Sequence, residues 1–281
     1  MRQKIVRYFT GIPDRLMKLK LGALLGFFAA LLVAAYFLVV QVVPWIGLKV
    51  ISPEQEMTLG EQLYKSIIAN ESPDTAKTKI AQQFADGLVL SKIYPIKITV
   101  VKSKTVNAFA LPGGHIVVYS GIIDAMQTPE EMAALLGHEA SHVNKRHSLR
   151  NILRSAASGL LVSVLISDVS GISAVLLQNA NKLRNLGYSR GLEEEADKEG
   201  MLLLLQNQIN PVGMRQLMES LEKEHKDLPG IVSFISTHPL TKDRIQHATA
   251  FIKAHAATSY PDHPALKDTW EKLKAVGNNK K

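Results

Sequence analysis

Two histidines and a glutamate occupy the pattern HExxH at residues 138–142, as His138, Glu139 and His142. On an α-helix, residues four positions apart share one face, so both imidazoles can reach a single Zn²⁺ ion at about 2.0–2.1 Å. Glu139 then lies beside the ion and can hold a water molecule. The alternative is a polar helix face with two solvated histidines, and the apolar residues around the motif oppose it because they draw the segment into a core.

The helix that carries this motif has its own start signal. Thr128 is followed by Pro129 and, three residues on, by Glu131, which is a capping box with proline at the first helical position. The spacing predicts a helix from there to about His147.

A catalytic zinc site usually takes three protein ligands and keeps a fourth position for water, so a further ligand is needed. Glu193 and Asp197 are four residues apart on a predicted helix, and one can bind the metal while the other accepts the outer N–H of a ligand histidine. The alternative is an acidic helix start favoured by the helix dipole. His147 is a weaker candidate because it lies off the face of His142. The extension HExxHxxGxxH is absent.

The remaining elements place these residues between helices and a small sheet. A capped helix is expected from Ser52 toward Asn70 and a second one from Ser72-Pro73. Alternating β-branched residues predict three short strands, and a Pro-Gly-Gly turn joins the last two. The expected strands are 96–101, 106–111 and 115–119, and the later helices are 192–206, one after Asn210-Pro211, and 241–256.

The amino-acid composition limits which side chains can bind a metal and which partners the chain can have. The 281 residues include no cysteine, so a metal has to be held by histidine and carboxylate side chains. The formal charge of +8 could indicate nucleic acid, but basic and aromatic residues do not alternate as in a nucleic-acid platform. Six basic residues instead precede the first apolar run, against one aspartate. We therefore expect a membrane and no nucleic acid as partner.

Residues 21–43 contain no charge, and a helix of this length crosses a hydrocarbon core of about 30 Å. The basic segment 1–20 predicts a cytoplasmic N-terminus, with everything after Val43 on the far side. A cleavable signal peptide is the alternative, but the run is long for one and no A-x-A site ends it.

A second apolar stretch covers residues 155–177. Asp168, six serines and two glycines dilute it, and a single crossing would separate residue 193 from the two histidines across the bilayer. We therefore expect it to fold back over the catalytic domain as a hairpin that shields the cleft or touches the membrane surface.

Three segments carry a family resemblance: LLGHEASHVNKRH, SRGLEEEAD and STHPLTKDRI. Together they resemble the membrane-linked metallopeptidase family that includes the HtpX heat-shock protease and the CAAX prenyl endopeptidase. The resemblance covers about residues 51–256. The single N-terminal anchor makes the chain more similar to the compact periplasmic members and to the mitochondrial inner-membrane stress peptidase, so CAAX processing is not implied.

The resemblance implies roles for particular residues. The glutamate of the family's ExxAD motif falls on Glu193, which becomes the third zinc ligand, with Asp197 as its supporting partner. Residues 107–123 resemble the segment in which an edge strand pairs with an extended substrate. His238 resembles a histidine near the metal that stabilises the oxyanion or caps the zinc at rest, and the alternative is an ordinary loop histidine. Arg244 either holds that loop or lies on the surface.

The other histidines are expected to be ordinary core or surface residues; they are His115, His225, His247, His255 and His263.

The sequence therefore predicts a mainly helical α+β fold. A cytoplasmic segment (1–20) and one transmembrane helix (21–43) precede a gluzincin-type metallopeptidase domain with a small edge-stranded sheet (51–256) and a C-terminal tail (257–281). The expected function is a zinc endopeptidase with one Zn²⁺ per chain. It is anchored in a bacterial inner membrane, faces the periplasm and acts on unfolded or damaged envelope proteins. Glu139 serves as the base, with His238 beside it. The alternatives are a non-proteolytic zinc-containing chaperone or assembly factor and a membrane tether in which HExxH is accidental.

Overall fold

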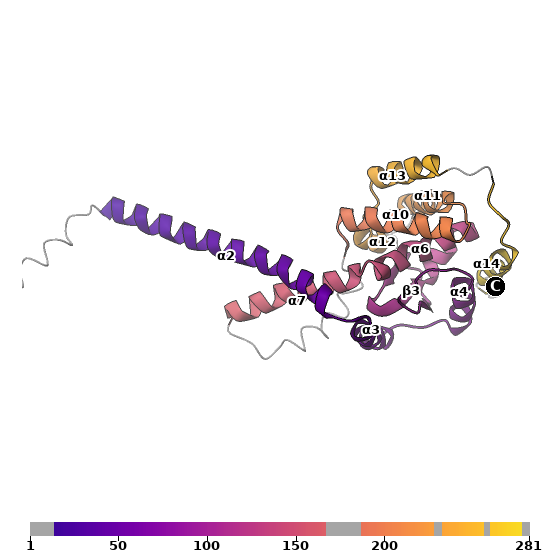
Figure 1. Cartoon of the computed structure of the whole chain (residues 1–281), viewed down its shortest axis with the longest axis horizontal. Helices are drawn as coiled ribbons and strands as arrows, with labels where there is room; N and C mark the ends of the chain where they lie inside the picture. Colours follow the sequence, from indigo (N-terminus) through magenta and orange to yellow (C-terminus); the bar gives the residue numbers. More distant parts are fainter. Residues whose placement is uncertain (1–13, 167–186, 228–231, 256–258, 277–281) are drawn as a thin grey trace, which may run out of the picture.

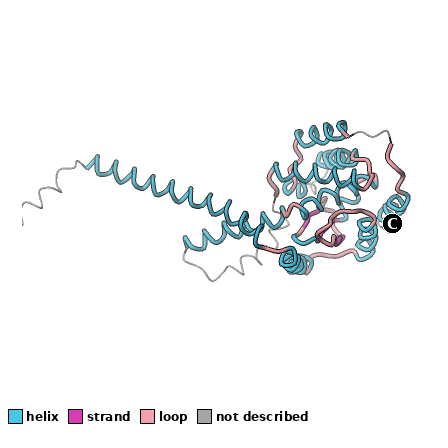
Figure 2. Tube along the Cα trace, viewed as in Figure 1, coloured by secondary structure: helices cyan, strands magenta, loops and turns pink. Residues whose placement is uncertain are grey.

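The computed structural model describes residues 14–166, 187–227, 232–255 and 259–276. A single long helix, α2 (Asp14–Val50), leads away from a body of shorter helices packed around a small sheet (Figure 1). The helices of the body begin with α3 (Pro53–Ile68), α4 (Thr75–Asp86), α5 (Ser120–Ala125), α6 (Pro129–Asn144) and α7 (His147–Ile166). They continue with α10 (Arg190–Gln206), α11 (Val212–Asp227), α12 (Val232–Thr237), α13 (Lys242–Ala254) and α14 (Pro264–Ala275). The fold is mainly helical, as predicted (Figure 2).

The three strands form one sheet in the order β1-β3-β2. Strand β1 (Lys97–Val101) runs parallel to β3 (His115–Tyr119), and β2 (Ala108–Ala110) pairs antiparallel with β3 through a short 3₁₀ turn. The predicted strands and turn are therefore confirmed. Strand β2 lies at an edge of the sheet, next to α6.

Successive side chains of a strand point to opposite faces of the sheet, and both faces of this sheet are covered. Along β3, Val117 and Tyr119 join a cluster with α3 and the start of α7, whereas Ile116 and Val118 face the larger core. That larger core contains α6, which α10 and α11 pack against. Helix α6 is buried almost from end to end, so its polar residues lie inside the protein.

Helix starts follow the predicted caps with one difference. The side chains of Ser52 and Thr128 each accept a hydrogen bond from the backbone three residues on, as the capping boxes predict. The expected start at Ser72-Pro73 was wrong. Asp74 caps α4 instead, and Pro73 is bridged to Val101 beside the sheet.

Helix α6 ends earlier than predicted, at Asn144. Arg146 follows with a φ of 57°, a left-handed conformation that breaks the helix, and α7 begins at His147. The guanidinium of Arg146 donates to the carbonyls of Leu48 and Ile51 at 2.6 and 2.7 Å and to Glu56 at 2.6 Å. The end of the HExxH helix is therefore attached to the end of α2.

The expected fold-back of residues 155–177 over the catalytic domain was wrong for the part that the structure describes. Helix α7 leaves the body and packs along α2 (Figure 1). Its Ser158 receives a hydrogen bond from Tyr36 at 3.4 Å, well inside the apolar run. Helix α7 is therefore covered by α2, and not by the surface of the catalytic domain as expected. Residues 167–177 lie outside the described residues.

The segment expected as a C-terminal tail contains α14, which packs on α4. Its Leu266, Trp270 and Leu273 are buried in the core, so the packed domain extends to Ala275.

Candidate metal centre

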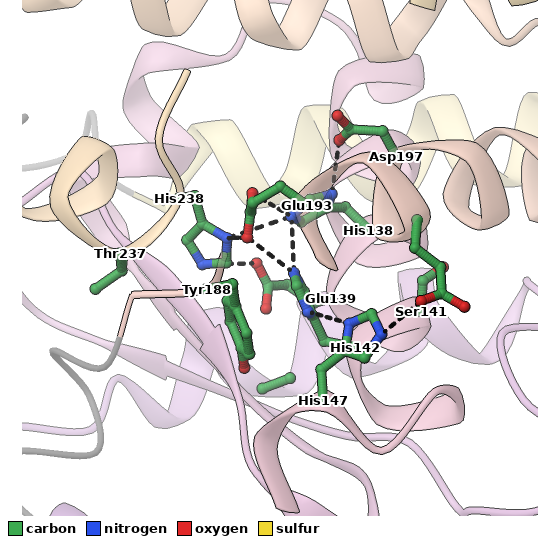
Figure 3. Close-up of polar contacts among 12 residues, drawn as sticks. His138, Glu139, Ser141, His142, His147, Tyr188, Glu193, Asp197, Thr237 and His238 are labelled. Atoms are coloured by element: carbon green, nitrogen blue, oxygen red, sulfur yellow. Dashed lines mark hydrogen bonds and ion pairs between the residues drawn. The ribbon is translucent and has the colours of Figure 1, made fainter. Parts of the chain in front are cut away.

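Four side chains from three elements converge at the middle of the body. His138 and His142 come from α6, Glu193 from the first turn of α10, and His238 follows α12 (Figure 3). One ligand atom from each lies within 4.8 Å of all the others. All four side chains are buried.

The distances between these atoms fit a single small cation. His138 Nε2 lies 3.1 Å from His142 Nε2 and 3.3 Å from His238 Nδ1. Glu193 Oε1 lies 3.4 Å from His142 Nε2 and 3.1 Å from His238 Nδ1. Tetrahedral ligands at about 2.0–2.1 Å from Zn²⁺ would be about 3.3–3.4 Å apart, so this set of nitrogen and carboxylate donors fits zinc.

His238 stands in this ring as a fourth donor. Its ring stacks on Phe234 at 4.7 Å between centroids, and its Nδ1 faces the other three ligand atoms while Nε2 lies 3.7 Å from Glu139 Oε1. A set of four protein donors resembles a closed site, whereas a catalytic site keeps one position open. With His238 as the fourth donor, a four-coordinate ion here would have no open position for water.

Glu139 follows His138 directly in the sequence, and its carboxylate faces His238 (Figure 3). It is 0% exposed, and neither of its carboxylate oxygens has a hydrogen-bond partner among the described residues. Burial raises the pKa of this carboxyl, although the nearby His238 and His138 oppose the shift. A buried carboxylate whose oxygens accept no hydrogen bond is suited to accept and return a proton.

Asp197 supports the cluster from one turn further along α10. Its Oδ1 lies 3.0 Å from His138 Nδ1, the ring nitrogen that points away from the other ligands. Such a contact fixes the tautomer of a ligand histidine. Burial disfavours ionisation of Asp197, but the guanidinium of Arg244 outweighs burial and holds its pKa below the usual range.

Arg244 is buried, which excludes the surface role left open by the sequence. It binds Asp197 through two nitrogens at 2.6 and 2.7 Å, and a third nitrogen lies 2.7 Å from Glu193 Oε2. It also donates to the carbonyl of Pro239 at 3.0 Å, next to His238. One side chain thus positions both acidic residues of α10 and the loop that carries the fourth donor.

The second histidine of the motif has a support of its own. His142 Nδ1 lies 3.0 Å from His147 Nδ1, and His147 Nε2 lies 3.3 Å from Glu195 Oε2. Tyr188 stacks on the His142 ring at 3.8 Å between centroids, and its hydroxyl lies 2.9 Å from Ser148 Oγ. This ring is therefore held at its outer nitrogen and on one face.

The charges inside the cluster favour an anionic Glu193. Burial opposes its ionisation, but His238 and His142 outweigh burial, so the pKa of Glu193 lies well below its usual range. Burial also lowers the pKa of His142 well below its usual range, which keeps this imidazole neutral. A neutral imidazole and an ionised carboxylate are the forms that bind a metal.

Sequence reasoning left the role of Arg244 open and missed those of His147 and Tyr188. His147 was examined only as a metal ligand, and the break after Asn144 turns its ring back toward His142. A histidine five residues after the motif was the available signal for this contact. Tyr188 had no such signal, because only the fold brings it against α6.

The region that contains this centre is similar to known peptidases. The sequence model of peptidase family M48 matches residues 75–252. Mitochondrial metalloendopeptidase OMA1 of Schizosaccharomyces pombe is 31% identical over 178 residues, covering 63% of this chain and 52% of that protein. A putative beta-barrel assembly-enhancing protease of Vibrio cholerae is 26% identical over 208 residues, covering 68% and 43%.

Metalloprotease LoiP of Escherichia coli is 32% identical over 209 residues, covering 70% of this chain and 80% of that protein. The chain thus spans about half the length of the first two relatives and most of the third. The matched region contains all four donor residues and Glu139.

Proposed function

This chain belongs to peptidase family M48, and on that premise we propose that it is a membrane-anchored zinc metalloendopeptidase that hydrolyses unfolded or damaged envelope proteins. The observation that carries the proposal is the convergence of His138, His142 and Glu193 beside Glu139, which is buried and has no hydrogen-bond partner among the described residues. The family and the names of two relatives, a metalloendopeptidase and a metalloprotease, support the same activity.

In the proposed mechanism, His138, His142 and Glu193 hold the zinc ion. When bound, zinc polarises the scissile carbonyl and lowers the pKa of water toward 7. Glu139 takes the proton from the attacking water and returns it to the leaving amine. Asp197 and His147 keep the two ligand imidazoles in the tautomer that presents Nε2 to the metal.

We infer that the substrate binds as an extended strand along β2. This strand lies at the sheet edge and beside α6, the helix that carries His138 and His142. Pairing through the backbone selects for extended, unfolded chains rather than for one side-chain sequence.

His238 is proposed to close the site at rest. Glu139, His142, Glu193 and His238 are each 0% exposed, so the segment that carries His238 has to move before substrate and water reach the centre. The ligand-like position of His238 favours the capping role over oxyanion stabilisation.

We propose that α2 anchors the protein, with the basic N-terminus in the cytoplasm and the metallopeptidase domain in the periplasm. Within the described residues, Leu21–Val50 is the one helix long and apolar enough to cross a membrane. The name of the Vibrio cholerae relative, a putative beta-barrel assembly-enhancing protease, supports an envelope location and envelope proteins as substrates.

The test uses the full chain in neutral detergent, because α2 packs on α7 and bonds to Arg146. Wild type is compared with Glu139→Gln for cleavage of reduced, unfolded casein, and bound zinc is measured for both. A matched control is His255→Gln, on the exposed end of α13.

We expect about one zinc per chain in all three proteins, with cleavage lost only in Glu139→Gln. Zinc binding without cleavage by wild type, even after His238→Ala, would contradict the protease and favour a zinc-containing assembly factor. Wild-type protein that binds no zinc would favour the alternative of a membrane tether in which the HExxH pattern is accidental.

A further inference from the structure

A cavity of about 420 Å³ lies away from the metal centre, where α2 and α7 pack together. Helix α2 contributes Gln41, Trp45 and three apolar neighbours, and α7 contributes Arg150 and Arg154. The residues of α2 that line the cavity begin near the end of the uncharged run 21–43. Trp45, which is one of them, is 59% exposed. Tryptophan at the end of an apolar helix is typical of the membrane–water interface.

The cavity is lined by two positive charges and no negative one. Arg150 and Arg154 are four residues apart and so share one face of α7. Neither forms an ion pair with any residue that the structure describes. Arg154 Nη2 lies 3.5 Å from Gln41 Oε1, and Arg154 Nε is buried with no hydrogen-bond partner. A buried guanidinium nitrogen without an acceptor costs free energy, and two adjacent positive charges attract an anion, so the site favours an anionic hydrogen-bond acceptor.

The surface that continues from the cavity is apolar. Phe37 and Leu38, one to two turns deeper along α2, are 60% and 65% exposed, and Val42 at the cavity is 39% exposed. Acyl chains can cover these side chains while a headgroup lies between the arginines. The apolar surface beside the arginines places the cavity where lipid headgroups and acyl chains meet.

We propose that this cavity binds the phosphate of an anionic phospholipid in the leaflet next to the metallopeptidase domain. Guanidinium groups bind phosphate oxygens through paired hydrogen bonds, and Arg154 Nε is a donor available for such a pair. The inference goes beyond the proposed peptidase activity and rests on the proposed anchorage by α2. A lipid here would contact α2 and α7 together, and α7 begins three residues after the HExxH helix ends.

The experiment measures lipid binding by the full chain in neutral detergent, using native mass spectrometry with phosphatidylglycerol or phosphatidylcholine. Wild type is compared with Arg150→Gln/Arg154→Gln and with Arg150→Lys/Arg154→Lys, which keeps the charge. The matched control is Lys242→Gln/Lys253→Gln, which removes two exposed charges from α13. Inorganic phosphate is added as a competitor, and flotation with phosphatidylcholine vesicles reports anchorage.

We expect wild type and the α13 control to prefer phosphatidylglycerol. The double glutamine variant should lose about 10–30-fold in affinity, since each basic residue near an anionic surface contributes about 1 kcal/mol. The double lysine variant should keep part of the preference, which separates loss of charge from misfolding.

Equal binding of both lipids by wild type, or an unchanged preference in the double glutamine variant, would overturn the site. Displacement of the lipid by millimolar phosphate would show that the cavity binds a free anion, and it would contradict the proposal that a phospholipid occupies it. A chain that does not float with neutral vesicles would overturn the anchorage, and the lipid site with it.

Discussion

At the scale of single residues, the two ligand histidines of α6 are supported by different chemistry. The outer nitrogen of His138 faces a carboxylate, that of Asp197, whereas the outer nitrogen of His142 faces another imidazole, that of His147. For His142 to present Nε2 to zinc, its Nδ1 must carry the proton and His147 Nδ1 must accept it. Glu195 then accepts from His147 Nε2. The position of His142 therefore depends on two residues that do not bind metal.

Removing this support should weaken the metal site. We expect His147→Ala to lower zinc affinity by about 10–100-fold, because such supporting contacts hold the orientation of a ligand. Competition against a chromophoric chelator measures the change. The matched control is His247→Ala on α13, whose side chain is 65% exposed and which should bind zinc like wild type. An unchanged affinity in His147→Ala would contradict the supporting role.

His238 gives a prediction with a definite sign. If its Nδ1 is the fourth donor, His238→Ala opens a position for water and should raise the rate of casein cleavage several-fold in the zinc-loaded full chain. A histidine that stabilised the oxyanion would give the opposite result, a slower reaction. His238→Ala in the Glu139→Gln background is the control, and it should remain inactive.

At the scale of elements, the close approach of α3 to the turn between β2 and β3 positions the proposed substrate-binding edge. Gly60 of α3 lies against this turn, and a Cβ added there would be 1.8 Å from the carbonyl oxygen of Pro112. The contact is with backbone and cannot be relieved by rotating a side chain. Glycine at this position lets the helix support the strand beyond the turn.

We expect Gly60→Ala to lower the free energy of unfolding by about 1–3 kcal/mol, the usual cost of overpacking a buried contact. Urea denaturation of the zinc-loaded protein in detergent measures it. Gly191→Ala is the matched control, because nothing lies within 4 Å of a Cβ at that helical position. A loss of similar size in both variants would show that the contact with the turn is not the cause.

At the scale of the whole molecule, the metal centre joins parts of the chain that are far apart in sequence. Its donors come from α6, α10 and the segment after α12, so a bound ion links these elements in the folded state only. Ligands that bind only the folded state stabilise it by mass action. The packing of α10 and α11 on α6 supports the same arrangement without the metal.

Removing zinc with a chelator should therefore lower the thermal midpoint. At a free zinc concentration of about 100 times Kd the ion contributes about 2.7 kcal/mol, which corresponds to roughly 5–10 °C for a domain of this size. Differential scanning fluorimetry of the full chain measures the shift. Glu139→Gln should show the same shift and His138→Ala a much smaller one. A midpoint unaffected by the chelator would contradict a zinc site that joins these elements.

Local patterns in the sequence were sufficient for the elements that local physics controls. Capping boxes placed the starts of α3 and α6, alternation placed the strands, and the spacing of His138 and His142 placed both on one helical face. The family resemblance, now confirmed, singled out Glu193 among three adjacent glutamates. These features depend on residues a few positions apart, and the resemblance adds what spacing alone leaves open.

Only the tertiary structure decided the contacts between distant segments. It brought His147 and Tyr188 against His142 and buried Arg244 between two carboxylates. For His238, to which the resemblance had given two roles near the metal, it placed the side chain among the possible donors. It also turned α7 onto α2 instead of over the domain. The physical reason is that a charge is buried only beside a group that pairs with it, and an apolar helix only against another apolar surface. The sequence shows that such a partner is required, but it does not show which distant segment provides it.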